Sequence, residues 1–163
     1  MSVTDETLKA NELYAKSFTL GNLPMPPARK LAVLACMDAR LTVEQLMGLK
    51  TGEAHIIRNA GGIASEDAVR SLIISHYLLG TEEFVVINHT DCGMLTFTDA
   101  QLKKKLSDEL GVETDTAFLP FSDLEQSVRD DVATIRESRL LLKGIPVTGF
   151  IYDVKTGRLR RVA

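Results

Sequence analysis

Three side chains in this sequence are of the types that proteins use to bind transition metals. His89 and Cys92 lie three residues apart in the stretch NHTDCGM, and the only other cysteine, Cys36, lies far upstream in ACMDAR. Two thiolates and one imidazole form a good ligand set for zinc, and the H-x-x-C spacing lets one turn hold an ion with both side chains. The alternative is ordinary burial, in which the cysteines act as small apolar side chains and the histidine is a hydrogen-bonded core residue.

A carboxylate and a guanidinium follow the first cysteine at alternate positions, as Asp38 and Arg40 in the segment CMDAR. Alternate residues face the same side if the chain stays extended. Arg40 could then hold Asp38 in a two-pronged ion pair and keep the carboxylate ionised. The alternative is an exposed loop salt bridge, which contributes little to stability.

The cysteine and the histidine each stand at the end of a predicted buried strand. The continuous apolar run at residues 31–36 (LAVLAC) indicates a strand that is covered on both faces, and residues 82–89 (EEFVVINH) indicate another buried strand. Functional sites in parallel sheets form beyond the carboxyl ends of the strands. We therefore expect Cys36, His89 and Cys92 to meet at one edge of the sheet, although they are distant in sequence.

Helices and strands alternate along the rest of the chain. A strand running into a glycine loop is predicted at 55–62, and a strand at 147–154 is followed by a short returning strand. Helices are predicted at 5–18 after Thr4, from a Thr42–Gln45 capping box to about Gly48, from Ser65 to Gly80, at 99–110, and after a Ser122–Glu125 capping box. This alternation predicts an α/β fold with a mainly parallel central β-sheet flanked by helices.

The first 30 residues differ from the rest. An amphipathic helix carrying Leu8, Leu13, Tyr14 and Phe18 precedes the segment LPMPPARK, whose prolines block helix formation. We interpret 1–163 as a single domain, with residues 1–30 forming an N-terminal helical arm and a proline-rich linker.

The composition excludes several classes of protein. The chain has 163 residues, 25% charged residues and a net charge of −3, and its basic residues are spread out, so no nucleic-acid partner is expected. No apolar run approaches the roughly 20 residues that a bilayer requires, and the N-terminus lacks a signal-peptide layout. We therefore expect a cytoplasmic protein without a membrane partner, in which two cysteines serve a metal, a reaction or the core.

Taken together, the motifs resemble those of the β-class carbonic anhydrases. The resemblance rests on C-x-D-x-R, R-N-A-G-G and H-x-x-C-G between about Leu31 and Met94, and VTGFIYDVKTGRL is similar to the closing strand and hairpin of that family. It implies one zinc ion per chain on Cys36, His89 and Cys92, and an Asp38–Arg40 dyad. It also implies a homodimer or a dimer of dimers.

The implied activity is the reversible hydration of CO2 to bicarbonate by a zinc-bound hydroxide. Asp38 would orient the hydroxide and Arg40 would hold Asp38 away from the metal; without that restraint Asp38 could become a fourth ligand and close the site. The resemblance also implies that the Gly93 N–H contacts bicarbonate; the alternative is a tight turn that requires no side chain at Gly93. The backbone amides of Gly61 and Gly62 could line the substrate pocket, or these glycines could simply form a turn.

Other functions remain open at this point. GEAHIIRNAGG, LIISHYLL and FIYDV also resemble a subgroup that hydrolyses carbonyl sulfide, which would use the same zinc site. A structural-zinc protein or a bicarbonate sensor, locked by Asp38, is an alternative of another class. A thiol enzyme with Cys36 or Cys92 as nucleophile and His89 as base is a further one, but such a mechanism has no need of the Asp38–Arg40 pair.

Overall fold

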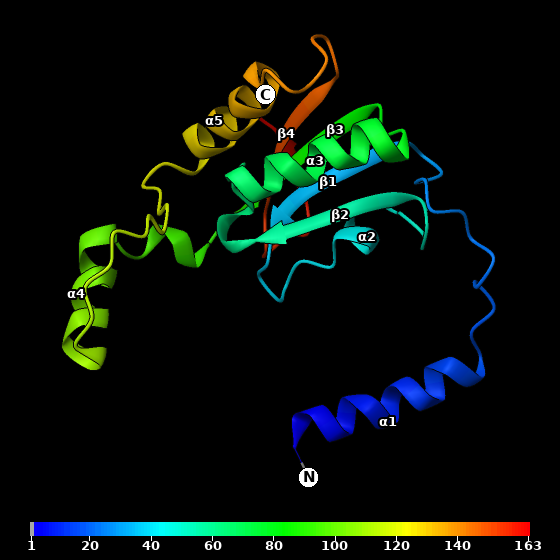
Figure 1. Ribbon diagram of the computed structural model, residues 1–163, viewed down its shortest axis with the longest axis horizontal. Coiled ribbons are helices and arrows are strands. Elements are labelled where there is room, and N and C mark those ends of the chain that lie inside the picture. Colours follow the sequence, from blue (N-terminus) through cyan, green and yellow to red (C-terminus); the bar gives the residue numbers. More distant parts are fainter. Residues whose placement is uncertain (1) are drawn as a thin grey trace.

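A five-stranded, mostly parallel β-sheet forms the centre of the molecule (Figure 1). The structure is a computed structural model that describes residues 2–163. The strand order is β2-β1-β3-β4-β5. The strands are β1 (Leu31–Cys36), β2 (Ala54–Asn59), β3 (Glu83–His89), β4 (Val147–Tyr152) and β5 (Leu159–Arg161), and only β5 is antiparallel to its neighbour. The predicted fold class is confirmed.

The register of the central strands places the candidate ligands at one edge. β1 lies between β2 and β3, with Ala35 opposite Ile87 on β3 and Cys36 opposite Asn59 on β2. β1 and β3 are buried along almost their whole length, as their continuous apolar runs predict. Cys36 and His89 therefore both reach the carboxyl edge of the sheet.

Helices cover the two faces of the sheet unequally (Figure 1). Helices α3 (Glu66–Leu79) and α5 (Leu124–Glu137) cover one face, where Leu72 and Val132 join Leu34 and Phe84 in the largest apolar cluster. The short helix α2 (Val43–Leu46) covers part of the other face and packs against Val33 and neighbouring residues. Helix α4 (Asp99–Leu110) projects from the sheet on a long connection.

The predicted start of α5 is wrong by one residue. The N-cap is Asp123, whose carboxylate accepts a hydrogen bond from the Gln126 N–H at 2.9 Å, whereas we predicted a cap by Ser122. Two overlapping patterns, S-x-x-E and D-x-x-Q, compete for this turn. The carboxylate prevails because an acceptor with a negative charge is favoured at a helix N-terminus.

The starts of the first two helices also differ from prediction. Helix α1 (Val3–Lys16) begins after Ser2, which forms a capping box with Asp5, and not after Thr4. In α2, Thr42 Oγ1 donates to the Gln45 side chain at 3.1 Å instead of capping the backbone, so the predicted capping box does not form. The predictions of α3, from Ser65 to Gly80, and of α4 are confirmed.

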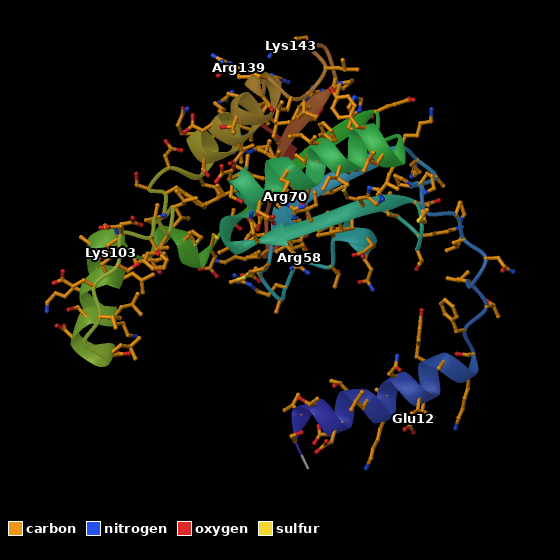
Figure 2. The ribbon with its side chains drawn as sticks, viewed as in Figure 1. Glu12, Arg58, Arg70, Lys103, Arg139 and Lys143 are labelled. Atoms are coloured by element: carbon orange, nitrogen blue, oxygen red, sulfur yellow. The ribbon has the colours of Figure 1, made fainter. Side chains whose placement is uncertain are left out.

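Helix α1 stands apart from the sheet (Figure 1). None of its residues is buried, and the apolar side chains of Leu8, Leu13 and Tyr14 are 60%, 67% and 57% exposed. Figure 2 shows side chains projecting from α1 on several sides with no other element against them. The N-terminal segment is thus an arm, with apolar surface that this chain alone leaves uncovered. Within residues 2–163, no helix has the length and apolar character needed to cross a membrane.

Candidate metal site

The three predicted ligands meet at the carboxyl edge of the sheet. Cys36 ends β1, His89 ends β3, and Cys92 lies three residues further along the loop. The two sulfur atoms and a ring nitrogen of His89 all lie within 4.8 Å of one another. All three residues are buried, His89 completely. This grouping matches the number and types of donor that a three-ligand zinc site needs.

The imidazole of His89 is oriented for metal binding. Its Nδ1 lies 2.8 Å from the Thr90 carbonyl oxygen, so Nδ1 carries the proton and donates it there. Its Nε2 is buried and has no hydrogen-bond partner within residues 2–163. A buried polar atom without a partner is costly, and a backbone carbonyl that fixes the tautomer is the usual arrangement behind a metal-bound histidine. The residues therefore fit a bound zinc ion.

The two thiols are electrostatically unequal. A hydrogen bond from the Cys92 thiol, with smaller contributions from His89 and nearby backbone groups, lowers the pKa of Cys36 despite its burial. The same contact with Cys36, together with burial, raises the pKa of Cys92. The contact between the two sulfur atoms thus favours the thiolate form of Cys36 and the protonated form of Cys92, and a bound cation would favour ionisation of both.

Asp38 and Arg40 form the predicted two-pronged ion pair. Arg40 Nε donates to Asp38 Oδ1 at 2.9 Å and Nη2 donates to Oδ2 at 2.8 Å. Hydrogen bonds from the Arg40 side chain are the main reason that the pKa of Asp38 lies far below its usual range. Asp38 Oδ2 also lies 3.7 Å from His89 Nε2. An ionised carboxylate thus lies beside the candidate metal position, and an arginine orients it.

Two residues that we did not single out from the sequence also support this pair. From β2, Arg58 donates to the Cys36 carbonyl oxygen at 3.0 Å and to the Asp38 carbonyl oxygen at 2.6 Å. From the loop after β3, Asp91 accepts a hydrogen bond from Arg40 Nη1 at 2.7 Å. Both residues lie within motifs that the sequence shows, Arg58 in RNAGG and Asp91 in HTDCG. Their positions in these motifs are the signal that could have identified them.

The glycines near the site have different surroundings. Gly62 is buried with φ +71°, and a Cβ there would lie 2.8 Å from the Cys36 nitrogen, so only glycine allows the loop to approach β1 this closely. Gly61 is also buried, and its Cβ would approach Ile63 and Met94. Gly93 is exposed and a Cβ there would meet no atom within 4 Å. Open space adjoins Gly93, whereas Gly62 fits against the strand that carries a ligand.

A buried carboxyl group lies behind the site. Asp131 of α5 is 5% exposed, accepts a hydrogen bond from the Ala64 N–H at 2.7 Å, and lies 3.4 Å from Nδ2 of Asn88, the residue before His89. Burial raises the pKa of this carboxyl from 3.8 to about 6. The stability that protonated Asp131 contributes is therefore complete below pH 3.8 and is lost as the pH rises through about 6.

The substitution Asp131→Asn should remove this pH dependence. The amide that it introduces keeps an acceptor for Ala64. Once the Asn88 amide turns, the new amide can also donate to Asn88 Oδ1, which is buried and has no hydrogen-bond partner among residues 2–163. The free energy of unfolding of the variant, relative to the unsubstituted protein, should rise between about pH 4.5 and 7.5 by up to about 2 kcal/mol. Urea unfolding at fixed protein and zinc concentrations measures this difference. Asp130→Asn, at an exposed neighbour, is the matched control; a difference for Asp131→Asn that is independent of pH would contradict the assignment.

Comparison with known proteins agrees with this geometry. An α/β domain with two thiols, an imidazole and an oriented carboxylate at the edge of its sheet defines a candidate single-metal protein. A family model described as carbonic anhydrase matches residues 31–117. The sequence is 46% identical to "Beta-carbonic anhydrase 1" of Mycobacterium tuberculosis, with 99% of each chain covered. The chain belongs to the β-carbonic anhydrase family.

Two further relatives indicate the range of that similarity. The crystal structure of a carbonic anhydrase from Streptococcus mutans superposes with a TM-score of 0.96 at 47% identity, covering 100% of this chain and 99% of that one. A carbon disulfide hydrolase from Acidianus is 35% identical, with 96% of this chain and 87% of that protein covered. The sequence resemblance to the β-class family is confirmed, and the family includes members named for a sulfur substrate.

Proposed function

We propose that this protein is a zinc-dependent carbonate dehydratase that hydrates CO2 reversibly to bicarbonate. The observation that carries the proposal is the convergence of Cys36, His89 and Cys92 beside a carboxylate that an arginine orients. The family relationship supports the same activity. The intact Asp38–Arg40 pair disfavours a thiol mechanism, which has no use for it.

Each residue at the edge of the sheet has a role in this proposal. Cys36, His89 and Cys92 would hold one zinc ion per chain. Bound zinc would supply a hydroxide nucleophile near neutral pH, because it lowers the pKa of coordinated water from about 15.7 to about 7. Asp38 would accept a hydrogen bond from this nucleophile and orient it toward the carbon of CO2. Arg40 keeps Asp38 ionised and turned away from the metal.

The remaining site residues and the closed state follow from the same geometry. Open space beside Gly93 supports a role for its N–H in binding bicarbonate, while Gly61 and Gly62 shape the wall behind Cys36. Asp38 lies near enough to His89 Nε2 to become the fourth ligand if Arg40 releases it. A chain that Asp38 held permanently in this closed state would be a structural-zinc protein or a bicarbonate sensor, the alternative of another class considered from the sequence.

Hydrolysis of a sulfur analogue is the second candidate. The resemblance to carbonyl sulfide hydrolases and the carbon disulfide hydrolase among the relatives favour it. Carbonyl sulfide and carbon disulfide are linear, like CO2, and the same nucleophile could attack all three. The metal ligands alone therefore do not select the substrate. The width and polarity of the pocket wall select it.

Parallel assays of one zinc-loaded preparation test the proposal. We expect kcat/KM for CO2 hydration to exceed the values for hydrolysis of carbonyl sulfide and carbon disulfide. Stopped-flow hydration and sulfide release measure these activities on the same protein. Efficient turnover of a sulfur substrate with CO2 hydration near background would assign the chain to the second candidate, while the metal and dyad roles would stand.

We also expect a homodimer or a dimer of dimers. The exposed apolar side chains of α1 form surface that a second copy of the chain would cover, and closed symmetry is the usual outcome. Replacing Tyr14 and Phe18, whose rings lie 5.5 Å apart, by alanine should raise the dimer dissociation constant about tenfold or more. Lys16→Ala on the same segment is the control. Light scattering that finds a stable, active monomer of the unsubstituted chain would refute this assembly.

A further inference from the structure

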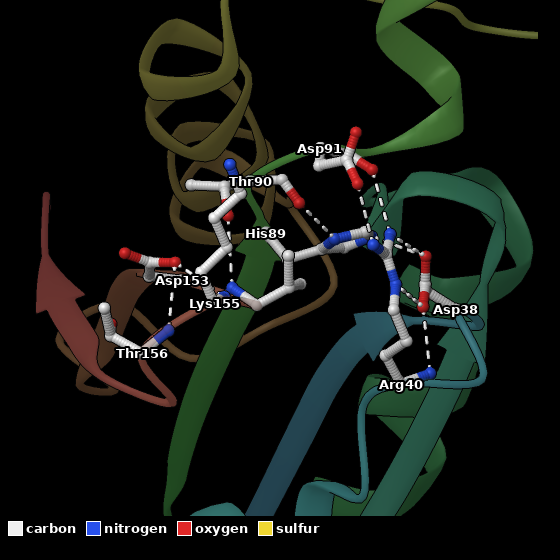
Figure 3. Close-up of polar contacts among 9 residues, drawn as sticks. Asp38, Arg40, His89, Thr90, Asp91, Asp153, Lys155 and Thr156 are labelled. Carbon is white, nitrogen blue, oxygen red and sulfur yellow. Dashed lines mark hydrogen bonds and ion pairs between the residues drawn. The ribbon is translucent and has the colours of Figure 1, made fainter.

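Arg40 is held from two sides, and only one of them is Asp38. Its Nη1 donates to Asp91 Oδ2 at 2.7 Å, and its Nη2 donates to the Asp91 carbonyl oxygen at 2.9 Å. Figure 3 shows the guanidinium between the carboxylates of Asp38 and Asp91. The Asp38–Arg40 pair spans only two residues of one loop, so it could swing as a unit, whereas the contacts with Asp91 tie it to a second loop.

The loop that carries Asp91 is itself fixed. Asp91 lies between His89 and Cys92 and has φ +55°, a conformation that aspartate tolerates better than most residues. The preceding residue, Thr90, donates its N–H to the Tyr152 carbonyl oxygen at 2.9 Å and accepts the Val154 N–H at its hydroxyl oxygen at 3.1 Å. The two acceptors of Asp91 are thus anchored to β4 and to both ligand positions in this loop.

We propose that Asp91 is a positioning residue that anchors Arg40 and thereby keeps Asp38 turned away from the metal position. This inference rests on the proposed function and extends it, because it assigns the restraint on Asp38 to the loop that carries His89 and Cys92. A shift of that loop then moves Arg40 with it. The state of the metal loop and the orientation of the Asp38 carboxylate are therefore coupled.

Exposure limits the expected size of the effect. The side chains of Asp91 and Arg40 are 71% and 47% exposed, and exposed ion pairs contribute little. The anchored loop reduces the entropy lost on pairing, and the carbonyl contact adds a second bond. We therefore expect changes of about fivefold on removing the Asp91 side chain, not complete loss.

Two substitutions separate the carboxylate from the backbone. Asp91→Gly removes the side chain and keeps the positive φ and the carbonyl contact. Asp91→Asn keeps a side-chain acceptor but removes the charge, so its effects should be smaller. Asp108→Asn is the matched control, because Asp108 is an exposed carboxylate on α4 that pairs with Lys104, away from the site.

The first readout is the mobility of Arg40, measured without turnover. NMR of 15N-labelled, zinc-loaded protein follows the Arg40 Nε–H signal, which Arg40→Lys assigns. Its hydrogen exchange should be about fivefold faster in Asp91→Gly, less so in Asp91→Asn, and unchanged in Asp108→Asn. Exchange that stays at the unsubstituted rate in Asp91→Gly overturns the proposal.

The second readout is the pH profile of CO2 hydration. If Asp91 acts through Arg40, Asp38 turns to the metal position more often, kcat/KM falls about fivefold, and the midpoint of the profile moves to higher pH. If Asp91 acts only through its charge, its removal moves the midpoint to lower pH. A midpoint that moves to lower pH overturns the positioning role. So does an Arg40 side chain that becomes mobile while kcat/KM is undiminished.

The proposed function and this inference can fail separately. If the zinc-loaded, unsubstituted chain hydrates no CO2, the proposed function fails, and the exchange rates still decide whether Asp91 holds Arg40.

Discussion

Replacing any one of Cys36, His89 or Cys92 should remove most of the bound zinc and reduce CO2 hydration by more than about 100-fold. Loss of a residue that merely supports a ligand lowers metal affinity or activity by roughly 10–100-fold, and loss of a ligand itself should cost more. The variants are Cys36→Ser, His89→Ala and Cys92→Ser. Metal analysis of each purified variant measures the loss directly.

The chain supplies a control for this experiment. His76 lies at the end of α3, where its Nδ1 is 2.7 Å from the Thr81 carbonyl oxygen, and it contributes nothing to the candidate metal site. His76→Ala should keep its zinc. Full zinc retention in all three folded ligand variants would rule out the proposed site.

The second large effect concerns Asp38 and Arg40. Asp38→Ala should keep zinc and lose about 100-fold in kcat, because the nucleophile is no longer aimed while all three ligands remain. Arg40→Ala should also lose activity, because Asp38 is free to turn toward the metal. Crystal structures of the zinc-loaded variants, with CO2 hydration assays, measure both effects.

Arg40→Lys separates the charge of Arg40 from its shape. Lysine keeps the positive charge but not the two parallel hydrogen bonds that Arg40 makes to Asp38, so its activity should lie between those of the unsubstituted protein and Arg40→Ala. An Arg40→Ala variant with an open metal position and unchanged activity would be inconsistent with this role.

The sequence predicted that Cys36, His89 and Cys92 lie together because their grouping follows from the topology of the strands. The apolar runs that end at Cys36 and His89 indicate two buried strands, and parallel neighbours bring their carboxyl ends to one edge. The register with Ala35 opposite Ile87 realises that expectation. The pairing of Asp38 with Arg40 was also predicted, but the extended segment on which we based it does not form. The chain turns here, with the Leu41 N–H donating to the Asp38 carbonyl oxygen at 3.0 Å and the Arg40 N–H donating to Asp38 Oδ1 at 2.9 Å.

Contacts between segments could not be read in the same way. The hydrogen bond from Arg58 to the Cys36 carbonyl oxygen depends on the pairing of β1 with β2, so the R-N-A-G-G motif marks Arg58 but does not predict this contact. Asp91 looks like an exposed acidic residue in the sequence. Its contact with Arg40 depends on a positive backbone φ, which the sequence pattern does not predict. The start of α5 was missed because Ser122 and Asp123 both offer good capping groups.

The N-terminal arm shows a limit of another kind. The apolar positions of residues 5–18 predicted an amphipathic helix, and a helix forms at Val3–Lys16. Such a pattern indicates that a helix has an apolar side to bury, but not against which surface. In the structure α1 buries none of its residues against the sheet. In the proposed assembly, a second copy of the chain, and not the core of the same chain, would cover its apolar side.

Stopped-flow CO2 hydration by a preparation of measured zinc content is the decisive test of the proposed activity. We expect one zinc ion per chain and a kcat/KM that rises from about pH 6.5 to 8.5, as coordinated water ionises. We also expect activity to disappear with the zinc on chelation and to return when zinc is restored. Hydration at the background rate in a chain that carries one zinc ion would contradict the proposed activity.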